Sequence, residues 1–194
     1  YADEAKRNGV HVYHLNIGQP DIQTPECALE AVRALDRAVL EYSPSQGYKS
    51  LRTKMVSYYA EYGIDLSPDE IIVTTGGSEA VMFAYMACLN PGDEIIVTDP
   101  SYANYMAFAI SCGAVVKSVK TSIDDGFRLP PIEKFEEQIT DKTRAILICN
   151  PNNPTGYLYS RAEMNQIRDL VMKYDLYLFS DEVYREFIYT GSPY

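Results

Sequence analysis

The 194-residue chain lacks several features that common functions require. It contains no tryptophan and only two histidines, His11 and His14, whose spacing would fit one helix face but which have no evident third ligand. The sequence therefore does not indicate a metal site, because such sites need at least three side-chain ligands. Its four cysteines stand singly without a CxxC pair, and three of them lie in apolar runs, where a reduced thiol acts as a small hydrophobic group. We expect no disulfides, and such thiols fit a reducing cytoplasm.

Basic residues and long apolar segments are also scarce. The chain has 17 Lys and Arg against 27 Asp and Glu, which gives a formal net charge of −10 at pH 7. This balance argues against nucleic-acid binding, because a phosphate backbone requires basic patches. No apolar stretch reaches the roughly 18 residues of a membrane span, and no cleavable signal pattern opens the chain. We therefore expect a soluble, cytoplasmic protein without nucleic-acid or membrane partners.

The chain is instead rich in alternating helical and strand patterns. Short apolar runs predict strands at 71–74, 94–98, 114–119, 144–149 and 177–180. Helical patterns are expected at 28–39, 49–61, 78–89, 102–111, up to about 139, and 160–174. The last of these opens with a capping box, Ser160-Arg161-Ala162-Glu163. This alternation predicts an α/β fold with a mostly parallel sheet flanked by helices on both faces.

Polar clusters follow two of the predicted strands. Asn150-Pro151-Asn152-Asn153-Pro154-Thr155-Gly156 comes after one apolar run, and Asp181-Glu182-Val183-Tyr184 comes after another. Open α/β sheets bind ligands just outside the carboxyl ends of their strands. An Asn, an Asp and a Tyr at one such rim suit a cofactor with a ring nitrogen and a phenolic oxygen.

A glycine turn, Gly76-Gly77-Ser78-Glu79, joins a predicted strand to a predicted helix. Glycine lets a phosphate approach the backbone, and the free amides of the first helical turn bind it. On its own such a turn is more often structural than functional. The other two motifs decide whether this turn is interpreted as structural or as phosphate-binding.

Together the three motifs resemble those of the class I/II aminotransferases, fold-type I enzymes that use pyridoxal 5'-phosphate. The resemblance implies the large cofactor-binding domain of that fold. It assigns Gly77, Ser78 and Glu79 to the loop that binds the cofactor phosphate. Tyr102, in the sequence Pro100-Ser101-Tyr102, matches an aromatic residue that stacks on the pyridine ring.

The resemblance also assigns catalytic roles to three residues. Asp181 matches the carboxylate that keeps the pyridine nitrogen protonated through its opposite charge. A protonated ring withdraws electrons from the substrate carbanion. Asn153 and Tyr184 match the residues that hydrogen-bond the phenolic oxygen.

Two upstream segments match as well. Residues 15–21 resemble the segment that closes over the substrate, with a backbone amide near Gly18 meeting the substrate carboxylate. Tyr42, at the start of a Pro/Gly loop, resembles the tyrosine that reaches the cofactor phosphate of the neighbouring subunit, which implies a homodimer with shared active sites. Residues 1–26 are expected to belong with the small domain, and residues 27–194 with the large domain.

The family's Schiff-base lysine and its carboxylate-binding arginine lie downstream of the element that matches Asp181 and Tyr184. This sequence ends at Tyr194 before either motif, so the resemblance covers about half of the family's length and the large domain is expected to be incomplete on its C-terminal side. In the family's strand order, two further strands would separate 71–74 from 176–180. We expect the 194 residues alone to be inactive.

The resemblance implies an aminotransferase that moves an amino group between an amino acid and a 2-keto acid. The amino donor cannot be read from these residues. A pyridoxal-phosphate-dependent lyase or decarboxylase of the same fold is an alternative, because cofactor contacts do not fix which bond breaks. A non-catalytic cofactor-binding or assembly module is a second alternative.

Overall fold

The computed structural model describes residues 1–14, 18, 20, 22–187 and 189. The chain divides into two units, Tyr1–Ser43 and Pro44–Tyr194, and the predicted domain boundary after residue 26 stays a prediction. The first unit contains α1 (Ala2–Arg7) and α2 (Glu26–Arg33), neither of which has a buried residue. Within the described ranges, no helix is both long enough and apolar enough to cross a membrane.

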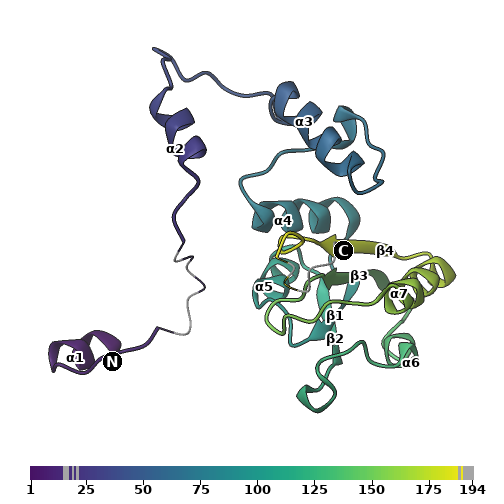
Figure 1. The fold of residues 1–194 in the computed structure, drawn as a ribbon. Coiled ribbons are helices and arrows are strands. Elements are labelled where there is room, and N and C mark those ends of the chain that lie inside the picture. Colours follow the sequence, from purple (N-terminus) through teal and green to yellow (C-terminus); the bar gives the residue numbers. More distant parts are fainter. Residues whose placement is uncertain (15–17, 19, 21, 188, 190–194) are drawn as a thin grey trace. The chain divides into compact units, whose positions relative to one another are not determined.

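The second unit is built on a four-stranded parallel sheet with the order β2-β1-β3-β4 (Figure 1). Its strands are β1 (Glu94–Asp99), β2 (Val115–Lys120), β3 (Thr143–Cys149) and β4 (Tyr177–Asp181). At the centre of the sheet, Ile95 of β1 pairs with Val116 on one side and Ala145 on the other. The predicted α/β fold with a parallel sheet is confirmed.

Helices cover both faces of this sheet. They are α4 (Gly77–Cys88) and α5 (Asn104–Ser111) on one face, and α6 (Ile132–Glu136) and α7 (Arg161–Tyr174) on the other. Helix α3 (Lys49–Ala60) packs instead beside a short 3₁₀ turn at Pro68–Glu70, and a second 3₁₀ turn spans Ile123–Asp125. The predicted capping box opens α7: the Ser160 hydroxyl accepts from the Glu163 amide at 3.3 Å, and the Ser160 amide donates to the Glu163 carboxylate at 2.7 Å.

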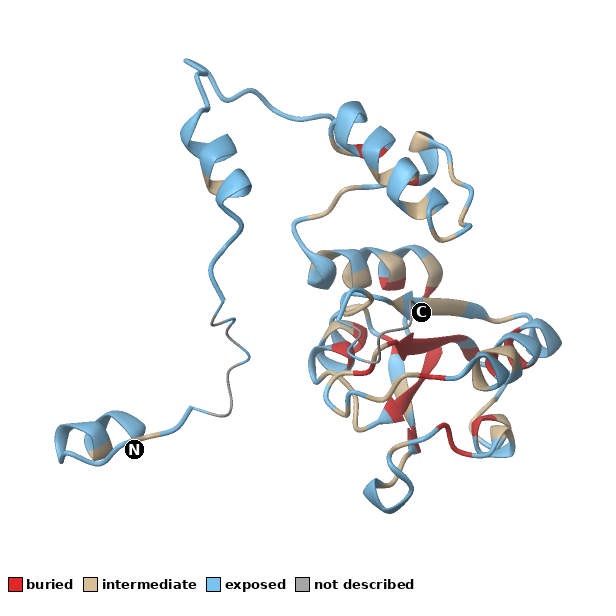
Figure 2. Cartoon of the chain, in the orientation of Figure 1, coloured by how far each residue is buried: buried red, intermediate tan, exposed pale blue. Residues whose placement is uncertain are grey.

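The core lies in two layers, one on each face of the sheet. Alternate residues of a strand point to opposite faces, so Ile95 and Val97 pack with α4 and α5, whereas Ile96 packs with α6 and α7. Figure 2 shows the buried residues concentrated in the strands and on the inner sides of these helices. The central strands β1 and β3 read as nearly continuous apolar runs because both of their faces are covered.

The predicted strand at 71–74 is wrong: these residues form no strand and pair with none of the described strands. The Val73 amide donates instead to the carbonyl of Gln46 at 3.0 Å. A single extended segment cannot form a ladder without a paired neighbour. A groove of about 780 Å³ separates residues 72–74 from β4, and α3 and α4 contribute to its walls.

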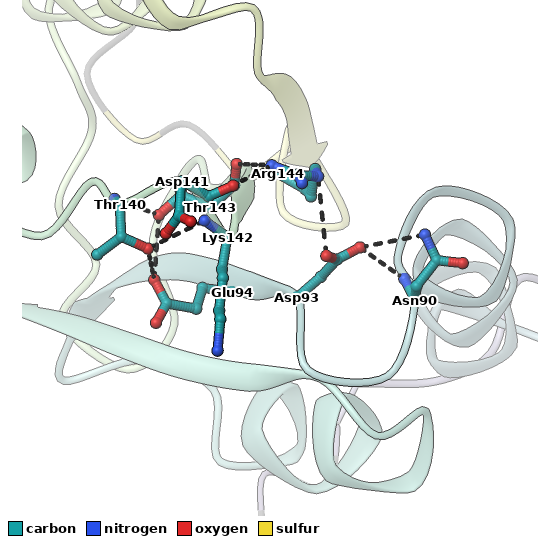
Figure 3. Close-up of polar contacts among 8 residues, drawn as sticks. All are labelled: Asn90, Asp93, Glu94, Thr140, Asp141, Lys142, Thr143 and Arg144. Carbon is teal, nitrogen blue, oxygen red and sulfur yellow. Dashed lines mark hydrogen bonds and ion pairs between the residues drawn. The ribbon is translucent and has the colours of Figure 1, made fainter.

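The amino ends of β1 and β3 are joined by a polar network (Figure 3). The nearly buried Glu94 accepts hydrogen bonds from the hydroxyls of Thr140 at 2.7 Å and Thr143 at 3.2 Å, and Lys117 lies 3.4 Å away. Burial alone would raise the pKa of Glu94, but these hydrogen bonds and the Lys117 charge outweigh it and hold the pKa below its usual value. This network lies at the end of the sheet opposite to the carboxyl ends of the strands and holds two strands together.

Candidate functional site

A cavity of about 190 Å³ opens at the carboxyl ends of the strands. After β1 the chain passes to β2 on one side of β1 and then returns to β3 on the other side. The direction in which strands are added to the sheet therefore reverses between β1 and β3. Such a reversal leaves a crevice where α/β proteins bind ligands. The residues that line the cavity are Gly77, Ser78, Val81, Tyr102, Tyr105, Phe108, Cys149, Asn153, Asp181, Val183 and Tyr184.

Six of the residues predicted from sequence meet in this cavity. They come from the start of α4, the loop after β1, the loop after β3 and the end of β4, and are Gly77, Ser78, Tyr102, Asn153, Asp181 and Tyr184. The structure thus brings together motifs that are more than 100 positions apart in the sequence. Their individual roles stay predictions.

The start of α4 supplies hydrogen-bond donors to the cavity. Gly76 precedes the helix with φ of +94°, a conformation that side chains rarely adopt, and its carbonyl accepts from the Thr74 hydroxyl at 2.9 Å. Gly77 and Ser78 follow in the first turn, where backbone amides have no intrahelical acceptor. The amides, the positive end of the helix dipole and the Ser78 hydroxyl together suit an anion.

Glu79 is placed differently from its neighbours. Its partly buried carboxylate accepts a hydrogen bond from the Thr75 amide at 2.6 Å and closes the turn before α4. The side chain does not line the cavity among the described residues. Its assignment to the phosphate loop stays a prediction, and its carboxylate already has a structural partner.

Asp181, the last residue of β4, is held from two directions. Its Oδ2 accepts from the hydroxyl of Tyr105 at 2.7 Å, and its Oδ1 accepts from the Val183 amide at 3.1 Å. Its own backbone carbonyl accepts from the Asn150 amide at 2.9 Å, which fixes β4 against the end of β3. The carboxylate therefore has a defined orientation at the cavity wall.

Asn153 and Tyr184 form a pair across two loops. The Asn153 side-chain amide donates to the Tyr184 hydroxyl at 3.2 Å. A closed turn supports Asn153: the Asn152 side chain donates to the Thr155 hydroxyl at 2.7 Å, and the Gly156 amide donates to the Asn152 carbonyl at 2.8 Å. An amide and a phenol held side by side can both bind one ligand oxygen.

Tyr102 lies on the loop after β1 and is half-buried in the cavity wall. Its ring meets the ring of Tyr105 edge to face, with centroids 5.4 Å apart and planes at 81°. The Asn104 side-chain amide donates to the Tyr102 hydroxyl at 2.7 Å. The orientation of the aromatic ring is therefore set by two neighbours, as a stacking surface requires.

Sequence reasoning did not identify two polar residues of the cavity, Tyr105 and Cys149. Tyr105 follows Tyr102 by three positions, a helical spacing that would have placed both on one face of the helix predicted at 102–111. Cys149 is the last residue of β3; its buried thiol donates to the Pro151 carbonyl at 3.2 Å, and burial raises its pKa. A thiol with a raised pKa is poorly suited to nucleophilic attack.

Two further predicted residues belong to the first unit. Gly18 and Tyr42 are both exposed there, and their predicted roles stay predictions. Most of the predicted substrate-closing segment, residues 15–17, 19 and 21, lies outside the described residues. His11 and His14 lie outside helices, and the His11 ring packs edge to face on Tyr13 with centroids 4.4 Å apart.

Comparison with known proteins gives consistent matches. The family model for aminotransferase class I and II matches residues 10–194. The aspartate/prephenate aminotransferase of Thermus thermophilus is 37% identical over 193 residues, which are 98% of this chain and 50% of that protein. A single-mutant structure of Thermus thermophilus aspartate aminotransferase has a TM-score of 0.93 at 37% identity, covering 100% of this chain and 51% of that one. Alanine aminotransferase from Pyrococcus furiosus has a TM-score of 0.91 at 36% identity, covering 99% and 51%. The chain thus spans about half the length of the relatives it matches.

Proposed function

Because this chain belongs to the class I and II aminotransferase family, we propose that its protein transfers an amino group between an amino acid and a 2-keto acid with pyridoxal 5'-phosphate as cofactor. The observation that carries this proposal is the convergence of four chemically distinct groups on one cavity. They are an anion-binding helix start, an aromatic ring, an amide–phenol pair and a carboxylate.

These groups fit the cofactor part by part. The amides at Gly77 and Ser78 and the Ser78 hydroxyl would hold the phosphate. Asp181 would accept from the protonated ring nitrogen, and Asn153 with Tyr184 would hydrogen-bond the phenolic oxygen. Tyr102 would pack on the ring.

The bound cofactor supplies an electron sink for the carbon that carries the amino group. Asp181 keeps the proton on the ring nitrogen, since an anion beside a basic nitrogen favours its charged form. Asn153 and Tyr184 donate to a negatively charged oxygen and so adjust its basicity. Tyr102 limits the tilt of the ring and keeps water from one face.

The residues that line the cavity in the described part of the chain include no lysine. We propose that the 194 residues alone give no turnover, because proton transfer at the substrate carbon needs a base such as the lysine amine. The matched relatives are named for different amino donors, aspartate and alanine, so we propose no particular donor.

We further propose a homodimer in which Tyr42 of one subunit completes the site of the other. The support is its resemblance to a tyrosine with that role, together with its location in the first unit, away in sequence from every cavity residue. Its side chain is fully exposed in the single chain and is free to meet a partner.

The decisive experiment replaces Asp181 with alanine in the natural full-length protein. We expect kcat for amino transfer to fall by about 100-fold or more, because the lost charge is needed as the carbanion forms. Circular dichroism should show an unchanged fold. Cys149→Ala is the matched control: it alters the neighbouring cavity wall without removing a charge and should leave kcat within a few-fold of wild type.

Product analysis tests the alternatives in the same assay. Release of carbon dioxide or elimination products without a 2-keto acid acceptor would favour a decarboxylase or lyase. Cofactor binding with no turnover by the full-length protein on any amino acid would favour a binding module. An unchanged kcat in Asp181→Ala would contradict the assignment of Asp181.

A further inference from the structure

The cavity contains a buried phenol to which the family resemblance assigned no role. Tyr105 lies in the first turn of α5, is 1% exposed and donates its hydroxyl proton to Asp181 Oδ2 at 2.7 Å. The two residues are 76 positions apart. Their contact therefore depends on the packing of α5 against the end of β4.

The hydrogen bonds of Asp181 leave acceptor positions free. Its Oδ1 accepts from the Val183 amide and its Oδ2 from Tyr105. Each carboxylate oxygen can accept two hydrogen bonds, so both retain a site after these contacts. Donors from two different segments thus fix the carboxylate plane without saturating it.

Packing alone does not explain this contact. Tyr85 is a second tyrosine in the same core cluster, fully buried, and its hydroxyl has no hydrogen-bond partner among the described residues. This core therefore accommodates a buried phenol without a hydrogen-bond partner. The pairing of Tyr105 with a cavity carboxylate is then a specific feature of the site.

The protonation state of Tyr105 suits a permanent donor. Burial, followed by its hydrogen bond to Asp181, raises its pKa far above the normal value, and the neighbouring Cys149 adds to the shift. The other titratable groups around the pair are Tyr85, Tyr102 and Tyr184, and no lysine or arginine lines the cavity in the described part of the chain. At neutral pH the phenol is protonated and donates its hydroxyl proton to the carboxylate.

We propose that Tyr105 is a positioning residue that orients the Asp181 carboxylate toward the cofactor ring nitrogen. This inference rests on the proposed function, because it needs a basic ring nitrogen in the cavity. Charge-assisted hydrogen bonds of this length are the stronger ones in proteins. Without the Tyr105 hydroxyl, the Asp181 carboxylate would be less firmly oriented and therefore less effective as a counter-ion to the ring nitrogen.

The test compares Tyr105→Phe with Tyr85→Phe in the natural full-length protein. Each variant removes one buried hydroxyl from the same core, but only the first removes a donor to Asp181. Without cofactor, the ¹³C resonance of the Asp181 carboxyl carbon should shift in Tyr105→Phe and remain in place in Tyr85→Phe. This measurement does not depend on the proposed function.

The second measurement uses ¹⁵N-labelled pyridoxal 5'-phosphate. In wild type and Tyr85→Phe, the ring nitrogen should stay protonated across neutral pH. In Tyr105→Phe, the pKa of the ring nitrogen should be lower, so that deprotonation occurs at a lower pH than in wild type. We expect kcat to fall about 10-fold in Tyr105→Phe, with KM little changed, because the effect is exerted mainly in the transition state.

The outcomes separate the two proposals. If the carboxyl carbon shifts but the ring nitrogen titrates as in wild type, the positioning role is overturned and the proposed function stands. If neither signal differs between the two variants, the contact itself is refuted. If no variant and no wild-type protein binds the cofactor, the proposed function fails and this inference fails with it.

Discussion

Replacing Gly47 with alanine tests how closely the loop before α3 packs on the extended segment at 71–74. Gly47 has φ of +91°, and a Cβ added there would lie 2.6 Å from Val73 Cβ and 2.7 Å from its Cγ2. Both backbones are fixed, because the Val73 amide donates to Gln46 at 3.0 Å and the Arg52 guanidinium donates to the Gly47 carbonyl at 3.2 Å. The new methyl group therefore cannot be accommodated without moving one of these two backbone segments.

The expected cost has two parts. A side chain at positive φ costs about 1–2 kcal/mol, and forcing a methyl group into filled space costs about 1–3 kcal/mol. Gly92 supplies the control: its φ is +88°, and no heavy atom of the described residues, apart from Gly92 and its two chain neighbours, would lie within 4 Å of an added Cβ. Gly92→Ala should thus show only the first cost, and Gly47→Ala should be about 1–3 kcal/mol less stable than it.

Urea unfolding of the full-length variants measures both costs, with the midpoint and slope recorded for each. The double variant Gly47→Ala/Val73→Gly should lose less stability than the two single changes predict, because without a Cβ at position 73 the overlap is removed. Equal destabilisation by Gly47→Ala and Gly92→Ala, or strict additivity in the double variant, would refute the reasoning.

Three further predictions address the cofactor, the dimer and the sheet. Tyr102→Ala should retain its fold but lose pyridoxal 5'-phosphate faster on dialysis, because the ring loses its apolar contact; unchanged retention would contradict the stacking role. Tyr42→Ala and Asp181→Ala, each inactive alone, should regain activity when subunits exchange, because one site of the mixed dimer has both residues intact; a mixture that stays inactive would argue against shared sites. Glu94→Gln should lower the free energy of unfolding at neutral pH, and the difference from wild type should vanish as acid protonates Glu94. The reason is that a carboxylate whose pKa is lowered in the folded state stabilises that state only at a pH where it is ionised. Urea midpoints at neutral and acidic pH measure this, and a difference that persists in acid would contradict it.

Much of the fold follows from short-range signals in the sequence. The apolar runs that became β3 and β4 and the capping box at Ser160 were predicted within a residue or two. Each depends on neighbours in sequence, so the pattern alone is sufficient. The convergence of Asn153 and Asp181 on one rim followed from a general property of parallel sheets.

Other features depend on contacts that no local pattern reveals. Residues 71–74 have the composition of a strand, but a strand exists only when another lies beside it, and no described strand does. The hydrogen bond between Tyr105 and Asp181 joins two helix-and-strand units whose relative placement the sequence leaves open.

The strand order also has a consequence for how the protein folds. β4 pairs only with β3 among the described strands, and it carries Asp181 and the turn to Tyr184. A folding intermediate made of β1, β2 and β3 would contain much of the core but lack the carboxylate and the phenol. A ligand of the cavity would therefore bind the native state and not this intermediate, and it would slow unfolding without accelerating the early folding steps. Refolding with and without ligand would then proceed at the same initial rate, while the lifetime of the folded protein would depend on ligand concentration.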